Sequence, residues 1–382
     1  MISRSFRKES RLNTEPLPHR AARFLHRKAR TITASRATVG LDGFVDEIVR
    51  VVDKRRSAES YTRLRTLAAF GARIHAAAGK SLNTELVVER VKLGGNGPIM
   101  ANALAAFGVQ VTCIGSLGYP GLHPAFAGLA RRATTYSVAE PGHTDALEFD
   151  DGKIMMGKHA SLSEVNWKHL INRVGRKTFE NCLVNANLVG FGNWTMLPQM
   201  SDIWEHMLAK VCPKLPAQPR HTFFFDLADP EKRDRHDIRH ALALIGRFQH
   251  YCNVYLGLNE KEAFEVGDVL GYRGARRGDK AIGTIAKFIH ARIKTSAVVV
   301  HPRSCAVAVS ASGVVRAVGP FTATPLISTG AGDHFNAGFC LGKLIGADDE
   351  ISLQLGVATS GYYVRTARSP GLKELANFLR LQ

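Results

Sequence analysis

Short apolar runs separated by helical patterns dominate the chain from residue 162 onward. Runs that are short, continuous and apolar are typical of strands buried on both faces of a parallel sheet. The pattern therefore predicts an α/β fold in which helices cover both faces of a central, mostly parallel sheet. The expected strands lie at residues 37–41, 109–115, 188–192, 221–227, 254–258 and 297–301.

A different pattern lies between the first two of these strands and just after them. Short alternating stretches predict half-exposed strands there, and an Asp150-Asp151-Gly152 turn is suited to a hairpin. Residues 61–78 repeat their apolar positions at helical spacing instead. These segments look like an addition to the α/β core. The strands expected in them lie at 48–52, 85–92, 135–138, 144–149 and 153–156.

Length and composition fit a globular protein. The chain has 382 residues, of which 45% are hydrophobic and 22% charged, enough for one large domain or one with a smaller appendage. No apolar run reaches the roughly 20 residues of a membrane-spanning helix, so no membrane partner is expected. The six cysteines form no CxxC pair, which favours reduced thiols, a cytoplasmic location and no structural zinc.

The net charge of +18 is the unusual feature of the composition. Residues 1–40 hold ten Lys and Arg against two Glu, a net +8, and we interpret residues 1–36 as a basic N-terminal extension. A solvated tail, a helix lying on the main domain and a transit peptide all fit this segment. The sequence lacks zinc-finger spacing and aromatic-basic interleaving, so nucleic-acid binding is not expected as the main role.

The strongest candidate chemistry lies in a glycine-rich stretch, residues 328–338. It runs from a turn straight into a helical pattern, and we expect an apolar strand over 317–327 before it. Backbone N–H groups and the helix dipole at such a junction favour an anion. Asp333 could accept a proton from an attacking hydroxyl there, which suits phosphoryl transfer. The structural alternative is that Asp333 only complements the helix dipole.

Polar residues also follow other predicted strands. Asp42 and Asp46 follow the first strand, and Asn259 and Glu262 open a helix after residues 254–258. The carboxyl ends of parallel strands are where α/β sheets bind ligands. Asn259 and Glu262 fit equally well an N-cap residue and its capping-box partner, which is a purely structural interpretation.

Four of these stretches, in this order, resemble motifs of the ribokinase-like (PfkB) carbohydrate and nucleoside kinases. They are DGFVD at 42–46, GGNG at 94–97, NEKE at 259–262 and TGAGD at 329–333. The resemblance covers residues 37–382, which are identified as a PfkB-type kinase domain. It implies a three-layer α/β fold with a small β lid, here drawn from about 47–92 and 134–158.

The resemblance also implies catalytic roles. Asp333 matches the general base that deprotonates the acceptor hydroxyl. Gly330, Ala331 and Gly332 match the anion hole, whose N–H groups stabilise charge on the phosphoryl group.

Binding roles follow from the same resemblance. The residues matched to substrate binding are Asp42, Asp46, Gly94, Gly95 and Asn96. Those matched to nucleotide binding are Thr329, Asn259 and Glu262, with Glu262 also organising Mg²⁺ through water. A further nucleotide candidate is Arg303, in a loop that usually reads LGxxG in the family.

The predicted function is ATP- and Mg²⁺-dependent phosphorylation of a hydroxyl on a sugar or sugar-like molecule. A nucleoside kinase and a catalytically idle regulatory protein are the alternatives. Ile327 stands where the family often has Asp, so dependence on a monovalent cation stays open. Ile99 stands where the sugar-binding turn usually has Asn, so the acceptor is not named. The family also suggests a homodimer formed through the lid.

Overall fold

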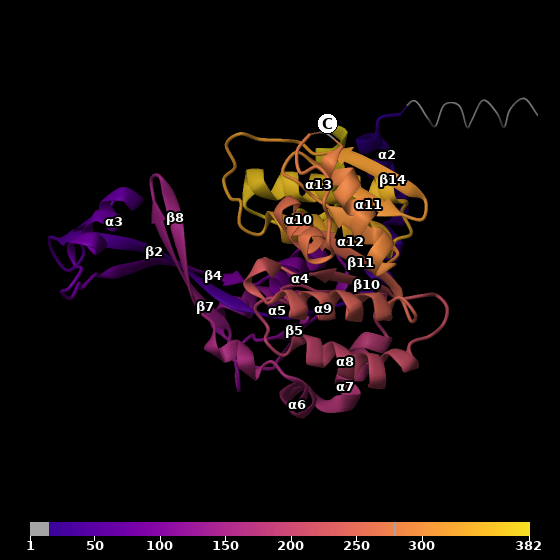
Figure 1. Cartoon of the computed structure of the whole chain (residues 1–382), viewed down its shortest axis with the longest axis horizontal. Helices are drawn as coiled ribbons and strands as arrows, with labels where there is room; N and C mark the ends of the chain where they lie inside the picture. The colour runs from indigo at the N-terminus through magenta and orange to yellow at the C-terminus, as the bar shows by residue number, and fades with distance from the viewer. Residues whose placement is uncertain (1–14, 279) are drawn as a thin grey trace, which may run out of the picture.

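A nine-stranded sheet runs through the centre of the molecule in the computed structural model, which describes residues 15–278 and 280–382 (Figure 1). Its order is β14-β13-β12-β11-β10-β9-β1-β5-β6, and all neighbours are parallel except the pairs made by β13. The strands are β1 Arg36–Leu41, β5 Gln110–Gly115, β6 Thr134–Ser137, β9 Leu188–Phe191, β10 Thr222–Asp226, β11 Asn253–Leu258, β12 Ala297–Val300, β13 Cys305–Ser310 and β14 Gly313–Val318.

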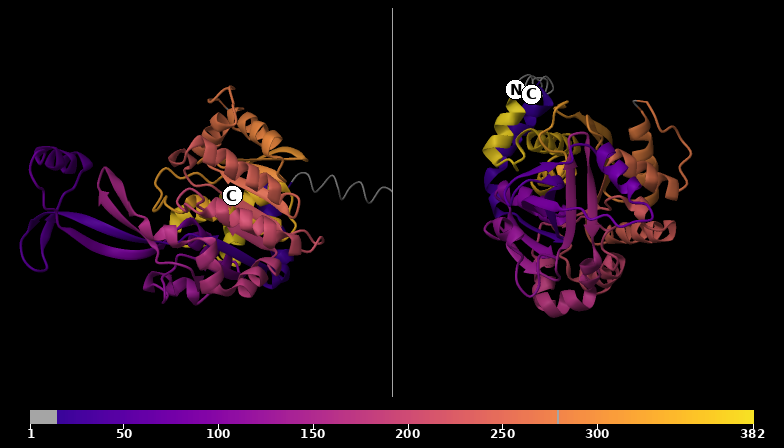
Figure 2. Two further views of the ribbon diagram at one scale, coloured as in Figure 1. Left: turned by 60° about the horizontal axis from the view of Figure 1, so that its bottom comes forward. Right: turned by 90° about the vertical axis from the view of Figure 1, so that its left-hand side faces the viewer.

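Helices cover both faces of this sheet, as the sequence predicted (Figures 1 and 2). One layer contains α7, α8, α9, α10 and α11, and the other contains α2, α4, α12, α13 and α14. The bounds are α2 Leu17–Ala34, α4 Asn96–Ala106, α5 Ala127–Ala130, α6 Trp167–Leu170, α7 Arg176–Val184, α8 Met200–Lys210, α9 Arg235–Phe248, α10 Glu260–Val269, α11 Ala281–Ile293, α12 Ala331–Leu344, α13 Asp349–Thr366 and α14 Leu372–Arg380.

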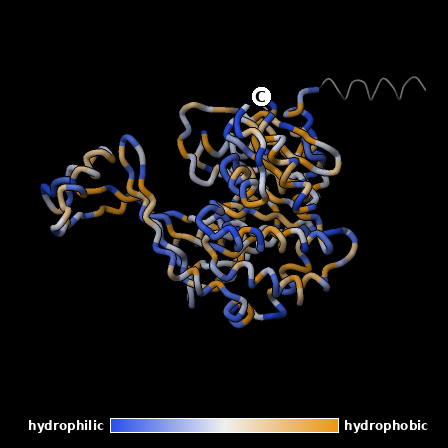
Figure 3. The backbone as a smooth tube through the Cα atoms, in the orientation of Figure 1, coloured by the Kyte–Doolittle hydropathy of each residue, from blue (hydrophilic) through white to orange (hydrophobic). Residues whose placement is uncertain are grey.

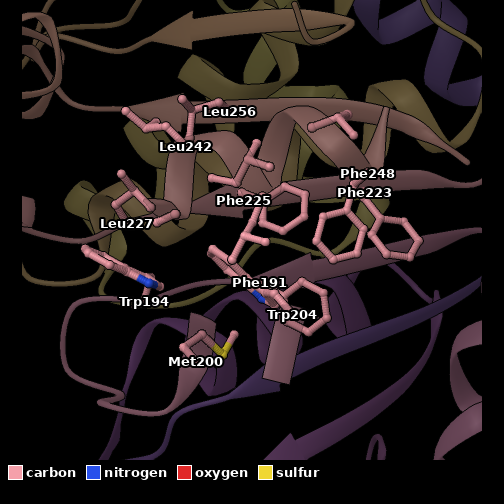
Figure 4. Packing of buried hydrophobic residues seen from close by; sticks show 14 of the residues in the cluster. Phe191, Trp194, Met200, Trp204, Phe223, Phe225, Leu227, Leu242, Phe248 and Leu256 are labelled. Atoms are coloured by element: carbon pink, nitrogen blue, oxygen red, sulfur yellow. The ribbon is translucent and has the colours of Figure 1, made fainter. Parts of the chain in front are cut away.

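Alternate residues of the central strands enter two separate cores, because strand side chains point to opposite faces in turn. In β10, Phe225 packs edge-on against Trp204 of α8, with ring centroids 5.1 Å apart. The preceding residue, Phe224, lies 6.3 Å from Phe339 of α12 on the other face. Figure 4 shows the first of these cores, and Figure 3 shows apolar residues concentrated along the central strands.

A second sheet of five strands forms the lid, which projects from the core (Figures 1 and 2). Its long strand, β2, follows β1 after only Asp42 and Gly43, and pairs with β4, β7 and β3. At the far end α3 closes a small apolar core that includes Phe70 and Phe149. The lid elements are β2 Phe44–Arg55, β3 Tyr61–Arg63, α3 Leu67–Ala76, β4 Leu86–Gly94, β7 Gly142–Phe149 and β8 Gly152–Lys158.

Three expected boundaries differ from the structure. The second lid segment begins at Gly142 rather than residue 134, because β6 pairs with β5 in the central sheet. Residues 61–78 hold the short strand β3 before α3, since Thr66 caps the helix. The strand expected over 317–327 ends at Val318. Pro320 and Pro325 have no N–H to donate to a sheet, and the apolar side chains of Phe321 and Leu326 are exposed.

Helix α2 occupies the described part of the predicted N-terminal extension; residues 1–14 lie outside the described chain. Four of its side chains are at most 2% exposed: Ala21, Ala22, Leu25 and Ile32. The helix packs against α13 and α14, and Arg20 lies 3.3 Å from Glu350. We therefore propose that the folded unit begins with α2 rather than at residue 37. No helix in residues 15–278 and 280–382 is long and apolar enough to span a membrane.

Replacing Leu25 with Ala should lower the free energy of unfolding by about 2–4 kcal/mol, because the side chain is buried and leaves a cavity. Urea denaturation measures the change. The exposed neighbour His26 provides the matched control, since its replacement by Ala should leave the midpoint unchanged. Equal midpoints for both variants would mean that α2 is an appendage.

Candidate active site

Polar side chains gather where five neighbouring strands of the central sheet end. Because the strands β1, β9, β10, β11 and β12 are parallel, their carboxyl ends meet at one edge of the sheet. The residues at or just after these ends are Asp42, Asn193, Asp226, Asn259 and His301. Helix α12 begins at the same edge, and its first turn carries Asp333.

Asp333 is a buried carboxylate with one free oxygen. Its Oδ1 accepts a hydrogen bond of 2.9 Å from the side-chain amide of Asn96, the first residue of α4. Its other oxygen accepts no hydrogen bond from the described residues. Burial, and then the neighbouring charges of Asp226 and Asp42, raise the pKa of Asp333 well above its usual range. The carboxylate therefore has an unusually high affinity for a proton.

The turn before Asp333 presents unpaired backbone N–H groups. Gly330 has φ of 89°, a conformation that favours glycine, and ends the turn at the start of α12. Within the described chain, the N–H groups of Gly330, Gly332 and Asp333 have no hydrogen-bond partner. The N–H of Ala331 instead donates to the carbonyl of Ser328 at 3.1 Å. In this structure the N–H of Ala331 closes the turn, so its expected contribution to the anion hole stays a prediction.

Asp42 holds the start of α4 in place. Its two oxygens accept hydrogen bonds of 2.8 Å from the N–H groups of Asn96 and Gly97, and one also accepts from Nδ2 of Asn193 at 3.0 Å. Burial raises the pKa of Asp42 to about 6, although these hydrogen bonds oppose the rise. Asp42 thus fixes Asn96, the residue that contacts Asp333. Direct contact of Asp42 with a substrate stays a prediction.

Asp46 lies on β2, where the lid joins the core. Its carboxylate lies 3.8 Å from Nζ of Lys92, and burial raises its pKa in spite of that charge. A Cβ on Gly94 would lie 2.7 Å from the Asp46 carboxyl group, so only glycine fits beside it. The predicted residues Asp46, Gly94, Gly95 and Asn96 are therefore brought together at the base of the lid.

The lid reaches the glycine turn through Lys153. Its Nζ, on β8, donates to Oγ1 of Thr329 at 2.6 Å. A cavity of about 80 Å³ lies beside this contact, lined by Asp46, Lys92 and Thr329 among others. Thr329, expected to bind nucleotide, thus lies on the lid side of the turn.

A larger cavity of about 620 Å³ lies on the other side of the turn. Its lining includes Asn259, Arg303, Phe321, Ala331 and Gly332. This volume is in the range of small-molecule sites. The structure thus brings the nucleotide candidates Asn259 and Arg303 beside the turn.

Asn259 and Glu262 also form the capping box that was the alternative reading of this motif. The side chain of Asn259 accepts from the N–H of Glu262 at 3.0 Å, and that of Glu262 accepts from the N–H of Asn259 at 2.8 Å. Burial, and then the charge of Asp226, raise the pKa of Glu262 to about 8. Asp226 itself accepts a hydrogen bond of 2.7 Å from Nδ2 of Asn336, and burial raises the pKa of Asp226 to about 6.

These acidic groups carry no compensating charge within the described chain. Asp226, Glu262 and Asp333 form no ion pair with Lys, Arg or His there, and the charges of Asp226 and Glu262 both raise the pKa of Asp333. In the same residues no group of three or more His, Cys, Asp or Glu side chains is close enough to hold a metal directly. A cation at this edge would therefore need water among its ligands.

Comparison with known proteins identifies the family. The family model described as prokaryotic ketohexokinase matches residues 19–381. The chain belongs to the prokaryotic ketohexokinase family. It is 29% identical over 349 residues to a ketohexokinase of Haloferax volcanii, and the match covers 91% of each chain.

Solved structures of similar fold extend the comparison. A ribokinase of Arabidopsis thaliana, solved with ribose and ATP, has a TM-score of 0.62 at 14% identity, covering 91% of this chain and 99% of its own. Phosphofructokinase-2 of Escherichia coli has a TM-score of 0.60 at 15% identity, with coverage of 91% and 98%. The predicted ribokinase-like fold and the predicted enzyme class, a carbohydrate kinase, are confirmed. The nucleoside kinase and idle regulatory alternatives are not favoured.

Sequence reasoning missed several residues of this site. Asn193 follows β9 and could have been found by the strand-end argument that found Asp42. Lys153 and Tyr363 carried no local signal, because their contacts with Thr329 join distant parts of the chain. His334 was read only as part of the helix, although it contacts the carbonyl of Gly330 at 2.7 Å.

Proposed function

We propose that this protein transfers the γ-phosphoryl group of ATP to a hydroxyl of a ketohexose. The observation that carries the proposal is the buried Asp333 carboxylate, with one free oxygen, beside three unpaired N–H groups in a chain of the prokaryotic ketohexokinase family. The ketohexose is taken from the family description and from the Haloferax relative.

In this mechanism Asp333 is the general base. Its free oxygen accepts the proton of the acceptor hydroxyl as that oxygen attacks phosphorus, and Asn96 holds the other oxygen. The raised pKa increases the proton affinity of the carboxylate, which suits a base. The N–H groups of Gly330, Gly332 and Asp333 would stabilise the charge on the moving phosphoryl group.

The two cavities suggest where the substrates bind. We place the sugar between Asp46, Gly94, Gly95 and Asn96 at the base of the lid, where carboxylate and amide groups can fix its hydroxyls. We place ATP in the cavity of about 620 Å³, with Arg303 toward the phosphates. The glycine turn lies between the two, which is the order that in-line transfer requires.

The residues present fit a Mg²⁺ ion held partly by water. Glu262 and Asp226 offer oxygen ligands, and burial, followed for Glu262 by the charge of Asp226, raises their pKa values. When bound, the ion would neutralise charge on the ATP phosphates. Dependence on a monovalent cation stays open, and a cytoplasmic location remains a prediction.

The lid strands expose apolar side chains that suit a homodimer. Leu86, Val88 and Val91 of β4 are 40–47% exposed, and Met155 and Met156 of β8 are 45% and 53% exposed. We propose that the lids of two copies cover these surfaces. Light scattering of the wild type beside Val88→Asp tests the pairing, which predicts that the substituted protein is a monomer.

A panel of acceptors tests the proposed function. ADP release is measured with ATP and Mg²⁺ in the presence of fructose and other ketohexoses, aldohexoses, ribose and adenosine. We expect a ketohexose to give the highest kcat/KM. Greater stimulation by adenosine, or by none of the acceptors, would overturn the assignment.

Replacing Lys153 with Met should lower kcat about tenfold, because a charge-assisted contact beside the transferred group is lost. The unfolding midpoint should not change, because exposed polar contacts contribute little to stability. Lys158→Met is the matched control, since Lys158 lies on the same strand and pairs with Asp145. Similar kcat values for both variants would remove Lys153 from the mechanism.

A further inference from the structure

A chain of hydrogen bonds joins the glycine turn to two distant parts of the fold, and the proposed mechanism does not use it. Nδ2 of Asn102, on α4, donates to Oγ of Ser369 at 3.2 Å. Ser369 lies between α13 and α14, and its Oγ is 2.9 Å from Nε2 of His334. Nδ1 of His334 is 2.7 Å from the carbonyl oxygen of Gly330.

The direction of every hydrogen bond in this chain is fixed. A carbonyl oxygen can only accept, so Nδ1 of His334 must carry the hydrogen that it donates to Gly330. Burial lowers the pKa of His334 to about 4, so the ring is neutral and Nε2 must accept. Nε2 therefore accepts from the hydroxyl of Ser369, whose oxygen in turn accepts from Asn102. Each hydrogen bond in the chain thus has one donor and one acceptor, and such a network is rigid.

Tyr363 of α13 supports the same turn. Its ring stacks on that of His334, with centroids 3.6 Å apart and planes at 12°. Its hydroxyl donates to the carbonyl of Thr329 at 3.0 Å. Two successive carbonyl groups, those of Thr329 and Gly330, are thus held by side chains from α12 and α13.

Holding a carbonyl also aims the next N–H group. In a trans peptide the N–H points opposite to the C=O of the same plane. The bond from Tyr363 to the Thr329 carbonyl therefore fixes the direction of the Gly330 N–H. The carbonyl of Gly330, at the start of α12, accepts both from the N–H of His334 at 3.1 Å and from Nδ1 of its ring at 2.7 Å, and it shares a peptide plane with the N–H of Ala331.

We propose that His334 and Tyr363, backed by Ser369 and Asn102, are positioning residues that hold the N–H groups of the glycine turn in their catalytic geometry. The proposal rests on the proposed function, in which these N–H groups stabilise the phosphoryl group. Gly330, Ala331 and Gly332 lack side chains that could order the turn from within. Apart from the bond that Ala331 donates to Ser328, their order must come from outside the turn, and an error of 1 Å in such a site costs up to about 100-fold in rate.

Two substitutions of His334 separate positioning from general packing. The amide nitrogen of Asn can take the place of Nδ1, so His334→Asn keeps a donor to Gly330. The amide nitrogen of Gln reaches the place of Nε2 instead, so His334→Gln loses the donor to Gly330. We expect His334→Gln to lower kcat about 10- to 100-fold with little change in the KM values. His334→Asn should retain most of kcat, and Tyr363→Phe should lower it several-fold.

His221→Gln is the matched control. His221 is also buried, and its Nε2 contacts the carbonyl of Val184 at 2.9 Å, but it lies before β10 at the opposite edge of the sheet. The kcat of His221→Gln should stay at the wild-type value even if the unfolding midpoint of this variant falls. Equal kcat for His334→Gln and His334→Asn, or a fall that only follows the unfolding midpoint, would overturn the proposal.

Hydrogen exchange makes the test independent of the substrate. The peptide covering residues 328–344 should exchange faster in His334→Gln than in His334→Asn, because only the Gln variant loses the side-chain donor to Gly330. Equal exchange in the two variants would also overturn the proposal. If the wild type phosphorylates no ketohexose while this difference in exchange is present, the proposed function fails and the positioning of the turn stands.

Discussion

Asp333→Asn is expected to lower the rate of ketohexose phosphorylation by about 10³-fold, because the variant loses the group that accepts the hydroxyl proton. Binding of ATP should persist, since the cavity proposed for ATP lies beyond the turn and the amide has the same shape as the carboxylate. Coupled measurement of ADP release gives kcat, and calorimetry gives the affinity for ATP. A rate near that of the wild type would exclude Asp333 as the base.

Asp348→Asn is the matched control for this substitution. Asp348 caps α13, where it accepts from the N–H of Ile351 at 2.8 Å, and it contacts neither cavity. Its replacement should leave kcat unchanged. A similar fall in both variants would show that loss of a carboxylate acts through stability alone.

Asp333→Asn should also change how the free energy of unfolding depends on pH. Because the pKa of Asp333 is raised in the folded state, the folded protein binds more protons than the unfolded chain above pH 4. The free energy of unfolding therefore falls as the pH rises through the folded pKa. Asp333→Asn removes this pH-dependent fall. The free energy of unfolding of the variant, relative to that of the wild type, should therefore increase from pH 5 to pH 8. Parallel curves of stability against pH would contradict the raised pKa.

Asp42→Ala is expected to lower the free energy of unfolding by about 2–4 kcal/mol, because it leaves the donors at Asn96, Gly97 and Asn193 without their acceptor. It should also lower kcat, since Asn96 holds Asp333. Urea denaturation and ADP release measure the two effects.

Asn193→Ala provides the comparison for Asp42→Ala. It removes only one of the donors and leaves the bonds to α4 in place, so its effects on stability and kcat should be smaller. Equal effects would mean that Asp42 acts mainly through Asn193 and not through the start of α4.

The sequence predicted those parts of the fold and site that depend on local pattern. Buried strands of a parallel sheet are continuous and apolar, and ligand groups follow their carboxyl ends, so the sheet and Asp42 could be located. The glycine-rich turn with Asp333 was found from its glycines and from the helical pattern that follows them. The hydrogen bonds of the turn could not be predicted. Which N–H closes the turn, here that of Ala331, depends on backbone angles that the residue types leave open.

Long-range contacts explain the other differences. The contact of Lys153 with Thr329 depends on how far the lid folds over the core, which no spacing in the sequence encodes. Phe321 and Leu326 are apolar but exposed, so hydrophobicity alone predicted a strand up to residue 327 where two prolines prevent one. Helix α2 has apolar residues among many arginines, and only its neighbours α13 and α14 show which side is buried.

The short link from β1 through Asp42 and Gly43 to β2 bears on how this family can diversify. The strand that carries the lid leaves the core directly beside the carboxylate that holds α4. A lid transplanted from a relative would therefore bring a new junction next to Asp42, and with it a new alignment of Asn96. Exchange of acceptor specificity by lid swapping should succeed only when the graft includes the Asp42 turn and the start of α4, which together form the smallest transferable module.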